Sequence, residues 1–589
     1  MYFRMKKAEV FLEKTWKTFQ KNQHTFPESV KQKFQTLLKH LQESLIQKDR
    51  ERSKLLYAEL KILSKAHFKK NSLKSGSDFI VALLFALCIA IVIRQAAFEL
   101  YEIPSGSMRP TYKETDRLIV SKTQFGLNIP LTTSHLLFDP KSVKRMGVIT
   151  FTGENMDIPN VKTNYFYIFP GYKQFIKRMI GLPGDTLYFY GGKIYGIDKQ
   201  GNNISAELQR SDLSYLEHLP FINIEGKVVS THSNSILIKQ MNVPLAKLYL
   251  SPSKEVHYDL VTPAPAPNFD LHELFGMGNF AGARIISKEN AHYLELTHHA
   301  SASKAKIAKD PFSRTRPMLH TEKSYIRLEE DHLKTLWKNL YTGRFIIENN
   351  QARRYGVQAL EARKSPYTLK IKAPDGMYEF YQGKLQQVKH QGTLFDVAID
   401  HPLATFDVAK TILLFNAGIE CDTRFLPSIK ENSIPSSRYA YFRDGDLYVI
   451  GAPLFKKSDP SLEKFLASEL EKVNTSSRYT PFIDQGPPTL EMIKTYGITV
   501  PEKHYFALGD NHAMSSDCRD FGFIPEDNLR GVPAFSFWAP GGRFGFQNHG
   551  IYPIITLPRE ISWTLLLAAF AFYKYRSRKS LRSLTFDMN

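Results

Sequence analysis

The chain has 589 residues and a formal net charge of +20, and it contains only three cysteines. This length is enough for about two to four domains with a real hydrophobic core, and the cysteine count excludes a small disulfide-stabilised scaffold. The basic charge is concentrated at the ends: residues 1–78 hold 18 basic against 8 acidic residues, and residues 574–589 hold 5 against one. Because both basic runs adjoin apolar segments, an anionic membrane surface explains them better than nucleic acid does.

Residues 5–75 are predicted to be helical. A single apolar stripe with three- and four-residue spacing begins a few positions after Pro27, a residue that suits the start of a helix. An earlier stretch around Trp16 and Phe19 is expected to pair with it as a helical hairpin, forming a small module of structural purpose. The stripe consists of Val30, Phe34, Leu37, Leu38, Leu41 and Leu45.

The segment from Phe79 to Phe98 is twenty residues long and carries one charge, Arg94. A helix of this length spans about 30 Å, the thickness of the bilayer core, and an arginine near its far end can extend its side chain to the interface. Four lysines between residues 65 and 74 precede the segment. Basic residues favour the cytoplasmic side, so the sequence predicts a cytoplasmic N-terminus and places the rest of the chain outside.

The middle of the chain has the pattern of short β-strands. Val148–Phe151, Thr186–Tyr190 and Lys193–Ile197 read as strands, and the last two are expected to form a hairpin across Gly191 and Gly192. The other predicted elements are strands within 235–243, 324–330, 368–373 and 446–455, helices at 271–280 and 331–339, and a proline-rich linker at 262–268.

A second apolar run, Ile561–Tyr573, lies near the C-terminus and is followed by a basic tail. Thirteen residues are few for a membrane span. The run either spans the membrane with the help of Ile551–Leu557, if Arg559 and Glu560 are tolerated between them, or lies in the interface as an interfacial helix. Both interpretations remain open from the sequence.

Three strings carry groups that suit nucleophilic catalysis. IPSGSMRPTY contains Ser107, FIKRMIGLPGD contains Lys177, and GDNHAMSSDCRDFGF spans residues 509–523. A serine hydroxyl needs a base, and a lysine acts as a base near neutral pH only when burial keeps it uncharged. Neither a CxxC nor an HExxH string is present, so no metal site and no cofactor are indicated.

These strings, in this order and after an apolar anchor, closely resemble those of bacterial type I signal peptidases. The resemblance implies a membrane-bound serine endopeptidase that removes signal peptides from exported preproteins, with Ser107 as the nucleophile and Lys177 as the general base. Ser105 matches the serine that completes the oxyanion hole, and Ser515 matches the serine that orients the lysine. Asp517 and Arg519 match a supporting charged pair, and Arg178 is interpreted as structural.

The expected fold is mainly β, with an antiparallel catalytic sheet and a large inserted α+β region. The expected partners are preproteins and the lipid bilayer of the bacterial cytoplasmic membrane, with the catalytic domain on its extracytoplasmic side; the size of the insertion leaves binding to the export machinery as a further hypothesis. A non-catalytic membrane scaffold and a self-cleaving Ser/Lys protease are the alternatives. The expected order is a cytoplasmic helical module (1–78), a transmembrane anchor (79–98), a first catalytic part (99–200), the insertion (201–480), a second catalytic part (481–550) and a candidate second membrane segment with a basic tail (551–589).

Overall fold

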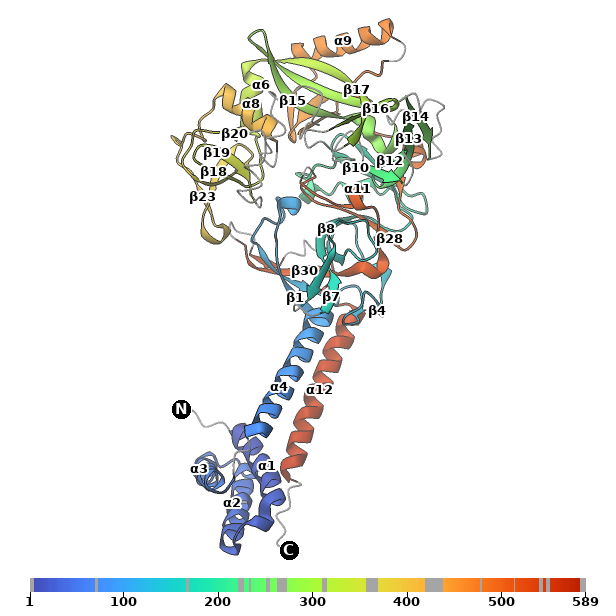
Figure 1. Cartoon of the computed structure of the whole chain (residues 1–589). Helices are drawn as coiled ribbons and strands as arrows, with labels where there is room; N and C mark the ends of the chain where they lie inside the picture. The colour runs from blue at the N-terminus through green and yellow to red at the C-terminus, as the bar shows by residue number, and fades with distance from the viewer. Residues whose placement is uncertain are drawn as a thin grey trace. The chain divides into compact units, whose positions relative to one another are not determined.

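The chain folds into two compact units, Met1–Ile93 with Ile555–Asn589, and Arg94–Ile554, and each is described by itself. The computed structural model (Figure 1) describes residues 5–68, 72–165, 169–220, 227–231, 235–250, 255–261, 273–309, 315–355, 369–418, 438–476, 479–512, 514–539, 544–546 and 551–582.

The smaller unit begins with three amphipathic helices, α1 (Met5–Asn22), α2 (Glu28–Ile46) and α3 (Arg50–His67). Their apolar faces form one core that contains most of the predicted stripe, and Pro27 directly precedes α2 as expected. The predicted hairpin of two helices is therefore a group of three. Asp49 ends the α2–α3 connection, and its side chain accepts a hydrogen bond from the Arg52 backbone N–H at the start of α3.

Two further helices of this unit expose apolar side chains. The first, α4 (Ser72–Val92), is followed by a turn of π-helix, Ile93–Ala97. Among the described residues, Phe79–Ala97 is the one helix long and apolar enough to cross a membrane, with a mean hydropathy of 2.5. The apolar run 561–573 lies within a longer helix, α12 (Leu557–Arg582), where Trp563 and Leu567 are 62% and 66% exposed.

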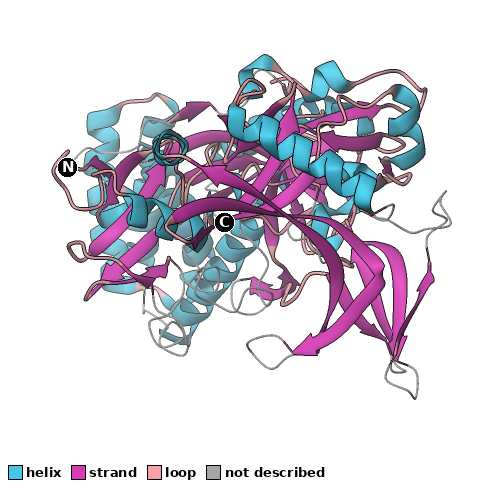
Figure 2. Ribbon diagram, turned by 90° about the horizontal axis from the view of Figure 1, so that it is seen from above, coloured by secondary structure: helices cyan, strands magenta, loops and turns pink. Residues whose placement is uncertain are grey.

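The larger unit contains an eight-stranded sheet whose described pairs are antiparallel. It joins segments from both ends of the unit, so residues 98–181 and 504–546 are neighbours in space. Figure 2 shows the strand-rich character of the fold in magenta. The strand order is β1 (Phe98–Glu102), β2 (Arg117–Ser121), β30 (Leu529–Trp538), β5 (Val148–Thr152), β8 (Gln174–Gly181), β28 (His504–Leu508) and β29 (Ile524–Pro525), with β31 (Gly545–Phe546) against β30.

The predicted hairpin is confirmed: β9 (Thr186–Tyr190) pairs with β10 (Lys193–Ile197). Gly191 and Gly192 both have positive φ, 58° and 71°, which a two-residue turn of this kind requires and which glycine adopts without a steric penalty. A short strand, β27 (Ile498–Thr499), joins β9 on its other side. Two small two-stranded sheets flank this region, β3 (Leu127–Asn128) with β4 (His135–Leu136) and β6 (Lys162–Tyr165) with β7 (Phe169–Tyr172).

The region between the two halves of the eight-stranded sheet builds three more antiparallel sheets. The first has four strands: β11 (Lys227–Thr231), β12 (Ser235–Gln240), β13 (Val243–Leu250) and β14 (Val256–Leu260). The second has six: β17 (Thr315–Leu328), β16 (Ala291–Lys309), β15 (Phe280–Lys288), β24 (Arg438–Arg443), β25 (Asp446–Val449) and β26 (Ala452–Phe455). The third also has six: β20 (Leu369–Lys370), β19 (Gln351–Arg354), β18 (Phe345–Glu348), β21 (Gly376–Tyr381), β22 (Lys384–Val388) and β23 (Leu394–Asp396).

Short helices cover these sheets, and side-chain caps mark several of their starts. Asp407, Asp459 and Thr489 each accept a hydrogen bond from a backbone N–H in the first turn. In Figure 1, α8 lies beside the sheet that contains β18, and residues of the two share a hydrophobic core. Among the described residues of this unit, the α-helices are α5 (Ser205–Leu208), α6 (Glu330–Lys338), α8 (Val408–Ala417), α9 (Pro460–Thr475), α10 (Leu490–Tyr496) and α11 (Cys518–Phe521).

The predicted fold class is confirmed: antiparallel sheets build the larger unit, an α+β region is inserted, and the N-terminal region is helical. The predicted helix at 331–339 is α6, but the one at 271–280 is wrong. Residues 274–279 form 3₁₀ turns in which Phe275 has a positive φ of 58°, and the next residue begins β15. The predicted linker at 262–268 lies outside the described residues. The sequence also left open a pairing of Cys421 with Cys518: Cys421 lies outside the described residues, and Cys518 is a free, buried thiol.

Candidate active site

Ser107 lies in a short 3₁₀ turn, Gly106–Met108, just beyond the end of β1. The side chain is largely buried, with 8% of the residue exposed. The loop after β28 holds this turn in place: the Asn511 backbone N–H donates to the Ser107 carbonyl at 3.0 Å, and Asn511 Nδ2 donates to the Gly106 carbonyl at 3.2 Å. The sequence strings around residues 107 and 511 therefore meet in one place.

Lys177 reaches the serine from the central strand β8. Its Nζ lies 2.9 Å from Ser107 Oγ, a hydrogen-bonding distance. The lysine is 4% exposed, and burial lowers the pKa of Lys177 to about 8, although the carboxylates of Asp517 and Asp510 oppose the shift. The sequence predicted this pair, and the structure brings the two side chains together across 70 positions of the chain.

Ser105 and Ser515 lie near the pair but differ in their contacts. Ser105 is exposed, and its Oγ lies 3.4 Å from Ser107 Oγ. Ser515 is buried, and no hydrogen bond joins its Oγ to Lys177 in the part of the chain that the structure describes, so the predicted contact with the lysine is not formed. The Ser515 hydroxyl nevertheless lies close to the turn that contains Ser107. A Cβ added at Gly509 would come within 2.2 Å of Ser515 Oγ and 2.5 Å of the Ser107 carbonyl oxygen, so only glycine permits this approach.

Asp517 and Arg519 support the loop that carries Ser515. Arg519 Nε lies 2.9 Å from Asp517 Oδ1, and both side chains are almost completely buried. The Asp517 carboxylate also accepts the backbone N–H of Gly509 at 3.0 Å, which fixes the end of β28. Burial alone would raise the pKa of Asp517, but the neighbouring Arg519 guanidinium holds it below the usual value. The predicted supporting pair is therefore present.

Two supporting residues were not predicted, Asp510 and Thr111. Asp510 accepts two hydrogen bonds from the buried guanidinium of Arg178, at 2.7 and 2.6 Å, and one from the Thr111 hydroxyl. Asp510 stands in the Gly-Asp-Asn part of the third string, so the sequence did contain a signal for it. Thr111 offered none, because a single threonine four residues after the serine is an ordinary loop residue.

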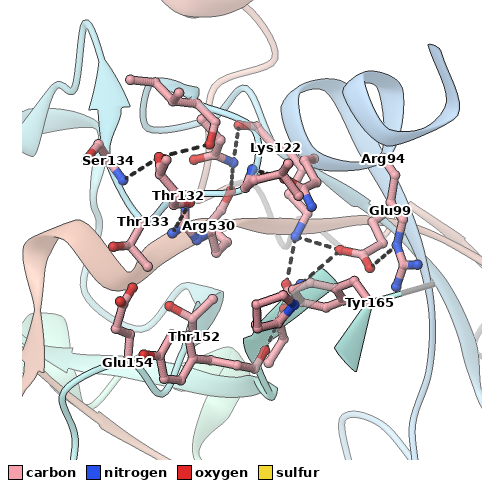
Figure 3. A pocket seen from close by; sticks show the side chains of 18 residues that line it. Arg94, Glu99, Lys122, Thr132, Thr133, Ser134, Thr152, Glu154, Tyr165 and Arg530 are labelled. Atoms are coloured by element: carbon pink, nitrogen blue, oxygen red, sulfur yellow. Dashed lines mark hydrogen bonds and ion pairs between the residues drawn. The ribbon is translucent and has the colours of Figure 1, made fainter. Parts of the chain in front are cut away.

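A separate polar cavity of about 310 Å³ lies in the larger unit, and its lining includes Arg94, Glu99 and Lys122. Figure 3 shows Arg94 and Lys122 directed toward the Glu99 carboxylate, at 2.7 and 2.9 Å. Burial lowers the pKa of Lys122 to about 8, as it does for Lys177. Neither Ser107 nor Lys177 lines this cavity, so it is distinct from the serine–lysine pair.

Comparison with known proteins identifies relatives of the two segments that build this site. The family model described as "Signal peptidase, peptidase S26" matches residues 77–251 and 439–538. A signal peptidase I of Pseudomonas aeruginosa is 33% identical over 147 residues, which cover 23% of this chain and 45% of that protein. A signal peptidase I of Rickettsia canadensis is 30% identical over 163 residues, which cover 26% of this chain and 57% of that protein.

The chain thus spans about half the length of these curated relatives. The family match is interrupted between residues 251 and 439, where the chain builds the third sheet and much of the second. Ser107 and Lys177 both fall in the first matched segment, and the loop with Asp510 falls in the second. These two segments are similar to the signal peptidase S26 family, and an insertion divides the matched region into two parts.

Proposed function

We propose that this chain is a membrane-bound endopeptidase that removes N-terminal signal peptides from exported preproteins. The observation that carries the proposal is the 2.9 Å distance between Lys177 Nζ and Ser107 Oγ in a buried setting. The family match and the names of the relatives support this reaction class. A lysine with a pKa of about 8 is partly uncharged near neutral pH, which a general base requires.

The proposed reaction passes through an acyl-enzyme. Uncharged Lys177 accepts the Ser107 proton while Oγ attacks the carbonyl carbon of the scissile bond. The Ser107 N–H and the Ser105 hydroxyl stabilise the resulting oxyanion, and protonated Lys177 then gives its proton to the leaving amine. A water molecule, deprotonated by the same lysine, hydrolyses the ester and restores the serine.

Two strand edges near the pair support binding of an extended substrate. β1 pairs with β2 on one side only, and β28 pairs with β8 only from Arg178 onward. Within the described residues, the first half of β8 and one side of β1 therefore offer unpaired backbone groups. An extended peptide can add to such edges by main-chain hydrogen bonds, which leaves small pockets to select its side chains.

Membrane attachment is part of the proposal and rests on the helix Phe79–Ala97. Its side chains face outward, with Phe79 and Phe85 69% and 68% exposed, which an aqueous setting would not favour. The basic residues before it favour a cytoplasmic N-terminus, with the larger unit on the opposite side. Because a signal peptide is itself apolar, a shared bilayer would bring substrate and enzyme together.

The test uses the full chain in detergent with a labelled preprotein and maps any cut by mass spectrometry. Wild type should cut after the signal peptide, and Ser107→Ala and Lys177→Ala should not. Lys173→Ala is the matched control, because Lys173 is an exposed lysine just before the same strand, and it should cut normally. Equal cutting by all four proteins would rule out the serine–lysine pair, and no cutting by wild type would favour a non-catalytic scaffold.

A further inference from the structure

A buried carboxylate of the insertion contacts the nucleophile loop, which is the segment 105–116 that contains Ser107. Glu379 stands on β21, inside the stretch that the family model does not match, and it is 0% exposed. Its carboxylate binds three cations: Arg109 Nη2 at 2.8 Å, Lys113 Nζ at 2.8 Å and Arg344 Nε at 2.9 Å. Two of these cations come from the loop that follows Ser107, although Glu379 is 270 positions from Arg109.

Glu114 of the same loop also joins this cluster. Arg109 also donates from Nε to Glu114 Oε2 at 2.8 Å, and Arg344 of the insertion donates to the Glu114 carbonyl at 3.0 Å. Three cations and two carboxylates therefore share one buried site. Burial raises the free energy of each charge unless a partner compensates it, so these five side chains depend on one another.

The cluster also packs directly against the residue before the nucleophile. A Cβ added at Gly106 would lie 2.9 Å from Glu114 Oε1 and 3.0 Å from Arg109 Nε. The backbone of Gly106 therefore lies against the side chains of Glu114 and Arg109, and Arg109 is bound by Glu379. Gly106 directly precedes Ser107 in the chain.

A second contact joins the insertion to the same loop. Thr115 Oγ1 donates to the Gln391 carbonyl at 3.4 Å, and a Cβ added at Gly392 would collide with that hydroxyl at 1.9 Å. The insertion therefore lies against the loop at two places, one electrostatic and one steric. The two contacts together indicate a specific packing interface between the insertion and the loop, rather than a single isolated ion pair.

We propose that Glu379 is a positioning residue for the nucleophile loop, so that the insertion is a structural part of the peptidase site and not only an appended binding region. The proposal rests on the proposed function. Glu379 acts through Arg109 and Lys113, which hold the loop so that Ser107 Oγ faces Lys177 Nζ. A displacement of reacting groups by about 1 Å can lower a rate by roughly 100-fold, so a loosened loop should reduce kcat more than substrate binding.

The test compares Glu379→Gln, Glu379→Asp and wild type, with Glu348→Gln as the control. Glu348 is a partly exposed carboxylate of the same sheet, and its side chain, 53% exposed, pairs with Arg353. With a labelled preprotein we expect Glu379→Gln to lose roughly 10- to 100-fold in kcat with KM changed less than threefold. Glu379→Asp keeps the charge and should be intermediate, and Glu348→Gln should match wild type. A kcat within twofold of wild type for both Glu379 variants would overturn the proposal.

A second readout needs no activity and separates this proposal from the proposed function. Hydrogen exchange of the backbone amides in residues 105–116 should become faster in Glu379→Gln, while β5 and β8 keep wild-type protection. Unchanged exchange in the loop would overturn the proposal even if wild type cleaves preproteins. Faster exchange would support it even if wild type cleaves nothing. If Glu379→Gln does not fold, the Asp variant decides both readouts.

Discussion

Arg178 and Asp510 form a two-bonded ion pair in which neither side chain is exposed to solvent. Arg178 follows Lys177 on β8, and Asp510 follows β28 and precedes Asn511, which binds the turn that contains Ser107. The pair therefore connects the strand that carries the lysine to the loop that holds the serine.

Asp510→Asn should destabilise the larger unit. The substitution leaves the Arg178 guanidinium buried with its charge unmatched, and breaking a buried pair in this way costs about 3–5 kcal/mol. Urea unfolding of the solubilised chain would measure the change in the free energy of unfolding. Glu102→Gln removes a partner of the exposed pair with Arg117 and should cost less than about 1 kcal/mol. Equal losses for the two variants would contradict the interpretation.

Cleavage should be faster at higher pH. Burial lowers the pKa of Lys177 to about 8, and only the uncharged amine can accept the serine proton. Below pH 8 the uncharged fraction falls about tenfold for each pH unit, so kcat/KM should follow that slope and level off above pH 8. A pH series with a labelled preprotein measures this profile. A profile that is flat from pH 5 to pH 8 would exclude Lys177 as the titrating base.

Ser105→Ala should slow the reaction without abolishing it. Loss of one oxyanion donor lowers kcat by about 10²–10³, and the Ser107 N–H remains. Ser105→Thr keeps a hydroxyl and is the matched control, expected to stay within about tenfold of wild type. Ser105 is exposed, so neither variant should alter the unfolding midpoint, and a loss of activity that tracks a loss of stability would argue against the oxyanion role.

The sequence predicted those features of the fold and of the site that depend on short local motifs. The hairpin at Gly191 and Gly192 was predictable because its turn chemistry lies within two residues, and the Ser107–Lys177 pair was predictable through the family resemblance. A helix at 271–280 was wrongly predicted, because a positive φ at Phe275 depends on the packing of that segment and not on its apolar spacing.

The contact of Glu379 with Arg109 and Lys113 could not be predicted. A single acidic residue in a strand-like segment is ordinarily a surface residue, and nothing near it in the sequence indicates a partner more than 260 positions away. Asp510 differs in one respect, because it stands in the third string, but nothing in the sequence indicated Arg178, 332 positions away, as its partner. Ion pairs of this kind follow from the fold as a whole, so the structure is needed to find them.

Cys88 offers a direct test of membrane insertion. It is exposed on α4, within the apolar helix, so a charged maleimide should not reach it from either side of sealed membranes and should label it after denaturation. In a Cys421→Ser background, Lys384→Cys is the control: its side chain is 61% exposed on the larger unit and should label from one side only. That side identifies where the larger unit lies.

Leu566→Cys extends the test to α12, where Leu566 is 60% exposed. Protection of Leu566→Cys from both sides would indicate a second span, labelling from one side would indicate an interfacial helix, and ready labelling of Cys88 in sealed membranes would contradict the anchor.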